Sequence, residues 1–225
     1  MPQIKNKVVA SIEARMGSSR LPGKVLMDIV DHHALARLVM RLKQSKKIDD
    51  IVVATTVSTK DDLICDWCQK NAIAYHRGSE DNVLDRVVQA HQKMQSNVIV
   101  EVTGDCTLLD PSIIDQGIDI FLNNHYDVVT NTVELSYAQG IDVQVFSYKN
   151  LKWVNDHIDD QAVLEHVSLY FYENPDKYHI YHMKAPDHLR APFVRMQLDY
   201  QEDLDFIRKI YQHLEPKYGP YFSYE

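Results

Sequence analysis

The residues from Arg15 to Lys24 concentrate side chains that could bind phosphate. The stretch offers three cationic side chains, two hydroxyls and two glycines. These residues are Arg15, Gly17, Ser18, Ser19, Arg20, Gly23 and Lys24. Glycines let backbone N–H groups approach an anion closely, and arginine and lysine neutralise its charge. The composition therefore predicts a loop that binds a triphosphate, and the alternative is an exposed turn with solvated charges.

The spacing of this loop excludes the best-known phosphate motifs. Five residues separate Gly17 from Gly23, one more than a P-loop allows. Val25 also stands where a P-loop needs Ser or Thr. The sequence contains no G-x-G-x-x-G motif, so a dinucleotide-binding fold has no support.

Two aspartates follow predicted strands. Asp105 lies in the turn Thr103-Gly104-Asp105 after the apolar residues 98–102, and Asp199 follows residues 194–198. Mg²⁺ is usually held by one or two carboxylates together with phosphate oxygens. We therefore predict that Asp105 and Asp199 hold one Mg²⁺ between them, while each Asp taken alone is also typical of a cap or a turn.

The elements that must position these residues alternate along the chain. Short apolar runs at 8–12, 51–55 and 98–102 predict buried strands. Apolar residues at helical spacing predict helices around 35–42, 63–68, 83–88 and 113–122. Such alternation indicates parallel strands with crossover helices. Ligands bind beyond the carboxyl ends of such strands, so the loop and the turn should share one edge of the sheet.

The later part of the chain is less regular. Residues 143–146, 178–183 and 194–198 are predicted to be strands, and residues 163–172 are predicted to be a helix. A final helix is expected over 199–214, with Asp199 and Glu202 in a capping box. No change in composition marks a second domain, so residues 1–225 are interpreted as one domain. The segment at about 131–192 is interpreted as a lid or a dimerisation segment.

Composition limits the class of protein. The net formal charge is −8, which argues against a general nucleic-acid binder, because such proteins carry a basic face. The polar residues 1–7 lack the apolar run of a signal peptide. No stretch approaches the length of about 18 apolar residues that a membrane helix needs. The three cysteines are few and odd in number, which favours a reducing cytoplasm.

Residues Ala14 to Lys24 resemble the A-R-x-G-S-x-R-L-P-G-K signature of the sugar cytidylyltransferases. That superfamily includes the acylneuraminate and 3-deoxy-manno-octulosonate cytidylyltransferases. Similarity is greatest to its spore-coat polysaccharide biosynthesis branch. Further segments match in the family's order, so the resemblance covers nearly the whole chain. They lie at residues 77–86, 103–111, 140–146, 165–167 and 199–204.

The resemblance implies a Rossmann-like nucleotidyltransferase fold, which is a three-layer α/β/α structure around a mostly parallel sheet. It implies that an oxygen of an acidic, nonulosonate-type sugar attacks the α-phosphate of CTP and releases pyrophosphate, with Mg²⁺ as cofactor. Surface polysaccharide biosynthesis and a homodimer are also implied.

Site residues follow from the matching positions. The implied catalytic residues are Arg15, Lys24 and Asp105, and the implied Mg²⁺ ligands are Asp105 and Asp199. The sugar is expected near Asp81 and Asp142. The implied nucleotide-binding residues are Ala14, Arg15, Gly17, Ser18, Ser19, Arg20, Lys24, Arg77, Thr103 and Gly104. No residue is identified as a general base.

Four positions depart from the family pattern. Where the family often has Gln, Arg, Pro and Pro, this chain has Glu13, Glu101, Thr107 and Gln201. Glu13 and Glu101 would place negative charge beside the phosphate site. An unpaired buried carboxylate is costly, so we expect these two side chains to face elsewhere, to pair with Arg or Lys, or to alter the site.

Two alternative functions remain open at this stage. A homologue that binds nucleotide or sugar with altered catalysis would explain Glu13 and Glu101. A nucleotide-sugar-dependent glycosyltransferase would share the fold and the metal, but it would usually carry a D-x-D pair. Asp105 is followed by Cys106 and Thr107 instead.

Overall fold

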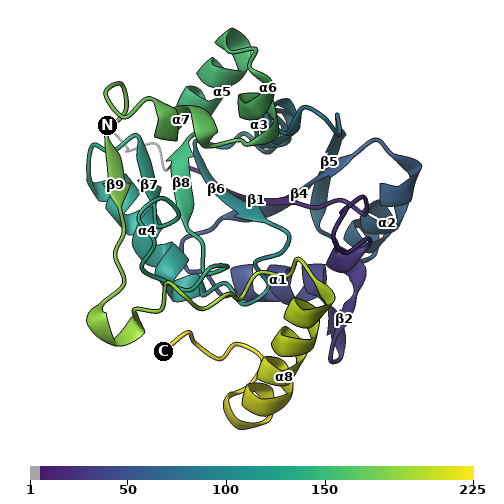
Figure 1. Ribbon diagram of the computed structural model, residues 1–225. Coiled ribbons are helices and arrows are strands. Elements are labelled where there is room, and N and C mark those ends of the chain that lie inside the picture. Colours follow the sequence, from purple (N-terminus) through teal and green to yellow (C-terminus); the bar gives the residue numbers. More distant parts are fainter. Residues whose placement is uncertain (1–5) are drawn as a thin grey trace.

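A seven-stranded sheet runs through the molecule in the order β5-β4-β1-β6-β8-β7-β9 (Figure 1). The computed structural model describes residues 6–225, and the first five residues of the polar start lie outside the described part. The strands are β1 (Val8–Glu13), β4 (Asp50–Thr56), β5 (Ala74–Gly78), β6 (Val98–Thr103), β7 (Val128–Thr130), β8 (Gln144–Ser147) and β9 (Ile180–His182). A separate hairpin joins β2 (Asp28–Ile29) to β3 (His32–His33).

The sheet is mostly parallel, as the sequence predicts. Strands β5, β4, β1 and β6 pair in parallel, and β9 is parallel to β7. Strand β8 alone runs antiparallel to both of its neighbours, β6 and β7. The predicted runs at 8–12, 51–55 and 98–102 became β1, β4 and β6, so the loop after β1 and the turn after β6 do share one edge.

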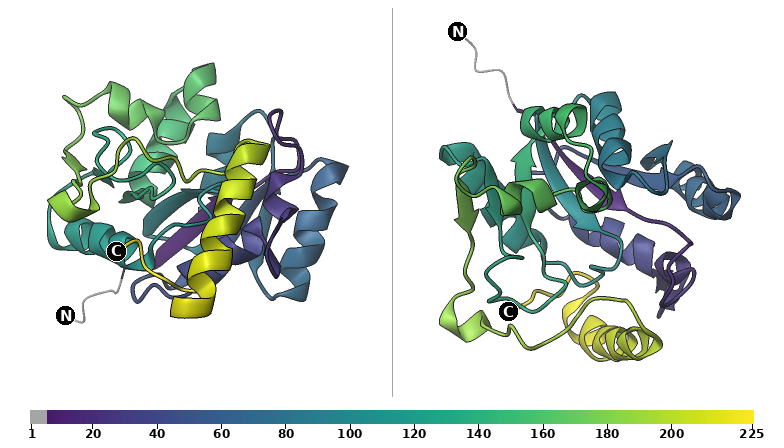
Figure 2. Two further views of the ribbon diagram at one scale, coloured as in Figure 1. Left: turned by 60° about the horizontal axis from the view of Figure 1, so that its bottom comes forward. Right: turned by 45° about the horizontal axis from the view of Figure 1, so that its top comes forward.

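Helices cover both faces of the sheet, which confirms the three-layer α/β/α prediction. One layer contains α1 (Ala34–Leu42), α2 (Asp62–Lys70), α4 (Pro111–Asn123) and α8 (Gln201–Tyr218). The other contains α3 (Val83–Met94), α5 (Tyr148–His157), α6 (Gln161–Glu165) and α7 (Leu169–Glu173). Figure 2 shows the two layers from further directions. Short 3-10 turns lie at Lys24–Leu26, Thr59–Asp61 and Asp187–Leu189.

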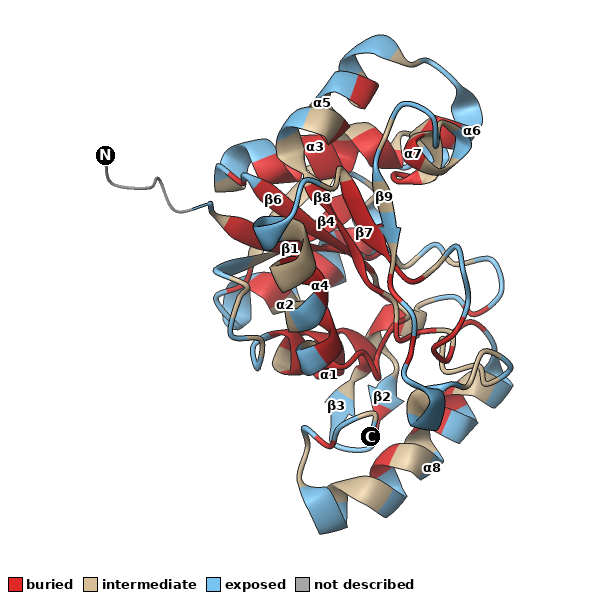
Figure 3. Cartoon of the chain, turned by 90° about the vertical axis from the view of Figure 1, so that its left-hand side faces the viewer, coloured by how far each residue is buried: buried red, intermediate tan, exposed pale blue. Residues whose placement is uncertain are grey.

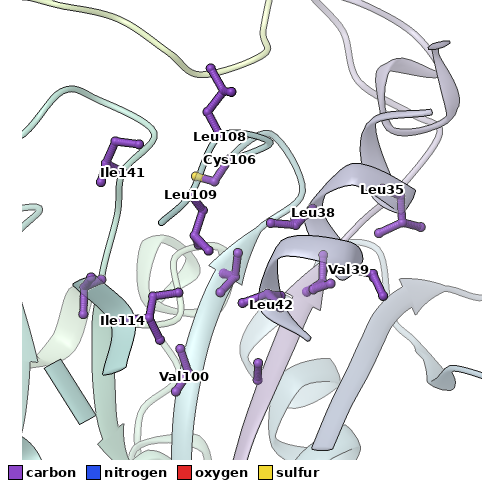
Figure 4. Close-up of a cluster of buried hydrophobic side chains, with 14 of the residues drawn as sticks. Leu35, Leu38, Val39, Leu42, Val100, Cys106, Leu108, Leu109, Ile114 and Ile141 are labelled. Atoms are coloured by element: carbon purple, nitrogen blue, oxygen red, sulfur yellow. The ribbon is translucent and has the colours of Figure 1, made fainter. Parts of the chain in front are cut away.

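The alternation of strand side chains divides the core into two halves. Val9 and Ile99 pack against α3, α5 and α7. Ala10 and Val100 face the other way, into the half of the core that contains Leu38 and the rest of α1. Figure 4 shows Val100 and Leu38 in this half. The sheet is buried on both faces while the helices keep exposed outer sides (Figure 3), which is typical of parallel sheets. None of the helices within residues 6–225 is long and apolar enough to cross a membrane.

Two predictions about the later chain were wrong in detail. Residues 194–198 do not form a strand of the sheet, because their backbone bonds to residue 139 and to Asp105 rather than to a sheet edge. The segment instead runs beside residue 139, with one isolated bridge between Gln139 and Arg195. The final helix begins after the N-cap Tyr200, and its capping carboxylate is Asp203 rather than Glu202.

The segment 131–192 belongs to the body of the fold. It supplies β8 and the helices α5, α6 and α7, and the predicted helix over 163–172 is interrupted between α6 and α7. Gln144 of β8 ties this segment together, because its Oε1 accepts hydrogen bonds from Ser168 at 2.9 Å and Tyr172 at 2.7 Å. The roles of a lid or a subunit contact stay predictions.

Candidate active site

A cavity of about 400 Å³ lies at the carboxyl ends of β1 and β6. Its walls come from the loop after β1, the turn after β6, and the helices α3 and α6. Most of the predicted nucleotide-binding residues line it. They are Ala14, Arg15, Ser18, Ser19, Arg20, Lys24, Thr103 and Gly104, and the predicted metal ligand Asp105 also lines the cavity.

The loop after β1 is closed by its own backbone. Gly23 N donates to Met16 O at 3.0 Å, and Lys24 N donates to Leu21 O at 3.2 Å. Gly23 has a φ of 74°, a conformation that glycine adopts without strain. The backbone therefore folds back at Gly23 and brings Lys24 into the cavity wall.

Lys24 joins the two predicted metal ligands. Its Nζ lies 3.3 Å from Asp105 Oδ2 and 2.8 Å from Asp199 Oδ1. Asp199 is also paired with Arg20 at 2.6 Å and Arg195 at 2.5 Å. Although burial raises the pKa of Asp199, the hydrogen bonds from Lys24 and Arg195 hold it below its usual value. Asp199 is therefore an anion at neutral pH.

The turn after β6 is held close to the end of β1. Gly104 N donates to Glu13 O at 2.9 Å, and a Cβ on Gly104 would lie only 2.8 Å from the same oxygen. Only glycine fits this approach without displacement. Leu198 N donates to Asp105 O at 3.0 Å, so the segment before Asp199 is attached to the same turn. These two hydrogen bonds bring Asp105 and Asp199 together.

The donor set fits a hard divalent cation bound with phosphate. Within residues 6–225 no group of three or more His, Cys, Asp or Glu side chains is gathered for metal binding. Asp105 and Asp199 nevertheless converge on one cation, the ammonium group of Lys24. Two carboxylates completed by phosphate oxygens and water suit Mg²⁺.

Asp61 anchors the phosphate loop from behind, and the sequence did not reveal it. It is 1% exposed and accepts hydrogen bonds from Met16 N at 2.7 Å, Thr56 N at 3.1 Å and Thr56 Oγ1 at 2.5 Å. The loop is thereby fixed to the end of β4. The sequence signal was only Asp61-Asp62 before a helix, which is typical of a cap.

Predicted ligand residues also lie outside the cavity lining: Asp199, which contacts Lys24 in its wall, and Arg77, Asp81 and Asp142. Arg77 is held by Thr56 O at 2.9 Å, Ser58 O at 2.8 Å and Asp62 at 2.7 Å. Asp81 is exposed on the surface. Asp142 lies behind the turn after β6, where it accepts hydrogen bonds from Gly140 N at 3.1 Å and Gln197 Nε2 at 3.2 Å.

Gly17 also lies outside the lining, although it belongs to the loop. Its neighbour Arg15 forms an ion pair with Glu80 at 3.2 Å. Both side chains are about half exposed, and such surface pairs contribute little. Arg15 is therefore free to turn toward a ligand.

Several residues that line the cavity were not predicted as ligands. They are Glu13, Val25, Val83, Arg86, Glu165 and His166. Glu165 and His166 belong to a segment that matches the family, which was the available signal. Arg86 donates to Ser79 O, and burial lowers its pKa.

Glu13 and Glu101 do not pair with Arg or Lys at ion-pair distance in the described part of the chain. Their carboxyl groups are close enough to shift the pKa of one another. Burial, followed by repulsion from Glu13, raises the pKa of Glu101 well above its usual value. Burial likewise raises the pKa of Glu13, and the neighbouring Arg86 opposes this. The pair therefore retains a proton at neutral pH.

Comparison with known proteins agrees with this geometry. Residues 9–221 match the family model described as Cytidylyltransferase. The spore coat polysaccharide biosynthesis protein SpsF of Bacillus subtilis is 35% identical over 214 residues, which cover 92% of this chain and 87% of that protein. A 3-deoxy-manno-octulosonate cytidylyltransferase of Lawsonia intracellularis is 28% identical, with 76% and 72% covered.

A solved structure has nearly the same fold. It is a cytidylyltransferase from Leptospira borgpetersenii, with a TM-score of 0.90, 31% identity, and coverage of 98% of this chain and 91% of that chain. The family match spans almost the whole sequence, and the residues of its signature line the cavity at the carboxyl end of the sheet. The chain therefore belongs to the cytidylyltransferase family and is a nucleotidyltransferase.

Proposed function

We propose that this cytidylyltransferase transfers CMP from CTP to an acidic sugar of the nonulosonate type and releases pyrophosphate. The observation that carries the proposal is the bridge formed by Lys24 between Asp105 and Asp199 beside the loop at 14–24. It brings a cation and two carboxylates to a cavity lined by hydroxyls and arginines. Similarity to 3-deoxy-manno-octulosonate cytidylyltransferases supports the sugar class, and similarity to SpsF supports a role in surface polysaccharide biosynthesis.

Binding of the triphosphate falls to the loop after β1. Ser18 and Ser19 offer hydroxyl donors, and Arg15, Arg20 and Lys24 offer positive charge. Cations positioned before the reaction stabilise charge that develops on the phosphates and on departing pyrophosphate. Because phosphoryl-type transfer needs little covalent help, positioning and charge supply most of the catalysis.

Asp105 and Asp199 would hold Mg²⁺, which would neutralise charge on the phosphates when bound. In the structure both carboxylates are paired with Lys24, and Asp199 is also paired with Arg20 and Arg195. A phosphate group would compete for Lys24 and Arg20, which would free Asp105 and leave Asp199 paired with Arg195 alone. We therefore propose that nucleotide and divalent cation bind together, with Lys24 moving from the carboxylates to the phosphates.

Pyrophosphate release tests the proposal directly. The chain is incubated with Mg²⁺ and each of the four common nucleoside triphosphates, against acidic and neutral sugars, with Asp105→Asn as the matched control. Release with CTP and one acidic sugar, abolished in Asp105→Asn, supports the proposal. Turnover of neutral sugars alone would reject the sugar class. Binding of CTP without turnover of any sugar would favour a homologue with altered catalysis.

The homodimer and the cytoplasmic location stay predictions. Light scattering of the purified chain tests the first.

A further inference from the structure

The cavity has two chemically different ends. One end contains Arg20 and Lys24 with Asp105, from the loop and turn beside α8. The other end is lined by Glu13 of β1, by Val83 and Arg86 of α3, and by Glu165 and His166 at the end of α6. The phosphates of CTP fit the cationic end. The end at Glu13 is therefore left for another part of the substrates.

The acidic end is built by two neighbouring strands. Ser11 of β1 is paired with Glu101 of β6, and Glu13 is paired with Thr103. Glu13 and Glu101 are thus diagonal neighbours on the face covered by α3. Glu101 is 5% exposed and lies behind Glu13, which lines the cavity.

The pair retains unused acceptors. Glu13 Oε1 and Glu101 Oε2 are buried and receive no hydrogen bond from an N–H or hydroxyl group of the described residues. Contact between the two carboxyls is a hydrogen bond only when one of them holds a proton. Arg86 of α3 lies close enough to Glu13 to lower its pKa against the effect of burial. A hydroxyl or amino group at this end could donate a hydrogen bond to Glu13, whereas a carboxylate has no proton to donate.

We propose that Glu13, supported by Glu101, determines sugar specificity by accepting a hydrogen bond from a hydroxyl or amino group of the sugar. An acidic sugar would bind with its carboxylate turned away from this wall. Glu13 would touch the sugar, and Glu101 would be a positioning residue that orients Glu13. The inference rests on the proposed function, because it assigns the acidic end of the cavity to the sugar.

The test compares wild type with Glu13→Gln and Glu101→Gln. Glu173→Gln is the matched control, because Glu173 is exposed on α7 and carries the same change of charge. Pyrophosphate release is measured with CTP and sugar varied in turn, and calorimetry measures sugar binding to the chain with CTP. The probes are 3-deoxy-manno-octulosonate, N-acetylneuraminate, glucose and glucosamine, the last two differing only in a hydroxyl or amino group.

The expected result is a rise in KM for the preferred sugar of about ten-fold in Glu13→Gln, because the amide oxygen accepts a weaker, uncharged hydrogen bond than the carboxylate. A smaller rise is expected in Glu101→Gln, and KM for CTP should stay unchanged in both variants. Wild type should bind glucose and glucosamine with different affinities, and this difference should become smaller in Glu13→Gln. The sugar that wild type binds more tightly shows whether Glu13 accepts from a hydroxyl or from an amino group.

Four outcomes would overturn the inference. If Glu13→Gln melts at a changed temperature but keeps the KM for sugar and the discrimination, the pair is only structural. If KM for CTP rises instead, Glu13 contacts the nucleotide. If wild type turns over a sugar and neither variant differs from Glu173→Gln, the inference fails while the proposed function stands. A wild type that neither binds nor converts any sugar of the set overturns both.

Discussion

Replacing Asp61 tests whether a residue outside the cavity controls nucleotide binding. The Asp61→Ala change removes the acceptor of three hydrogen bonds, from Met16 N, Thr56 N and Thr56 Oγ1. Asp61 is 1% exposed, so water cannot replace it without rearrangement. A buried donor left without a partner costs about 1–3 kcal/mol. Because Thr56 Oγ1 can rotate to another acceptor, we expect the free energy of unfolding to fall by about 3 kcal/mol in total.

The functional effect of Asp61→Ala should appear in the KM for CTP. Met16 lies between Arg15 and Gly17, so loss of its anchor lets the phosphate loop move before it binds. We expect KM for CTP to rise about ten-fold, with a smaller change in kcat, since ordering the loop would cost about 1.4 kcal/mol on binding. Asp61→Asn should show about half of each effect, because one amide oxygen can accept from Met16 or from Thr56 but not fully from both.

Urea unfolding measures the stability, and pyrophosphate release at varied CTP measures KM. Asp66→Asn is the matched control, since Asp66 lies on the exposed side of α2 in the same segment. The reasoning is refuted if Asp61→Ala unfolds at the same urea concentration as wild type. It is also refuted if stability falls while KM for CTP stays at the wild-type value, because the anchor would then stabilise the fold without shaping the loop.

Three other changes have outcomes that follow from the structure. Lys24→Met should lower kcat for pyrophosphate release by about 10²–10³-fold, the typical effect of removing one group that stabilises the transition state; a fall below ten-fold in a folded variant would contradict this. Gly104→Ala places a Cβ 2.8 Å from Glu13 O, so we expect a loss of about 1–3 kcal/mol of stability in urea unfolding, and unchanged stability would show that the turn can move freely. Burial lowers the pKa of His91 to about 3, so the folded chain binds fewer protons here than the unfolded chain between pH 3 and 6.5. The contribution of His91 is therefore complete above pH 6.5 and declines as pH falls, by about 2 kcal/mol at pH 5; urea unfolding at pH 5 and pH 7 should show a smaller difference in His91→Asn than in wild type, and equal differences would count against it.

The sequence predicts the part of the site that depends on neighbouring parallel strands. Val8–Ile12 and Val98–Val102 are apolar runs followed by polar turns. Once they are placed in one parallel sheet, their carboxyl ends must meet, and this brings Lys24 near Asp105. No other knowledge of the tertiary structure is needed for that step.

The sequence predicts that Asp199 lies beside Asp105, where the structure places it. It does not predict the contacts that bring Asp199 there. Asp199 was expected at the end of a strand, but residues 194–198 form none. Asp199 reaches the site because Leu198 N donates to Asp105 O and because Arg20, Lys24 and Arg195 surround its carboxylate. Hydrogen bonds of this kind connect irregular segments that lie far apart in sequence, so no local pattern encodes them.

The role of Arg77 in nucleotide binding stays a prediction, but the structure gives this side chain partners that the sequence does not indicate. A cationic side chain in a matching family segment suggests an anion ligand. In the fold, β5 brings Arg77 beside the end of β4, where Thr56 O and Ser58 O accept its hydrogen bonds and Asp62 pairs with it. Backbone carbonyls leave no trace in the sequence, so a pattern of residue types cannot distinguish an arginine that binds a ligand from one that fixes a loop.

Alternation along β1 and β6 explains why two acids are tolerated in buried strands. Ile12 and Val102 point into the core beneath α1, while Glu13 and Glu101 point to the face covered by α3. A shift of one residue would place both carboxyls on the opposite face of the sheet, among the leucines of α1 and away from the cavity. At their actual positions the two carboxyls meet each other, approach Arg86, and border a cavity that a substrate can enter. The alternation of side chains along a strand therefore builds the core and also determines which acids face the site. It places Glu13 at the end of the cavity away from the phosphate loop.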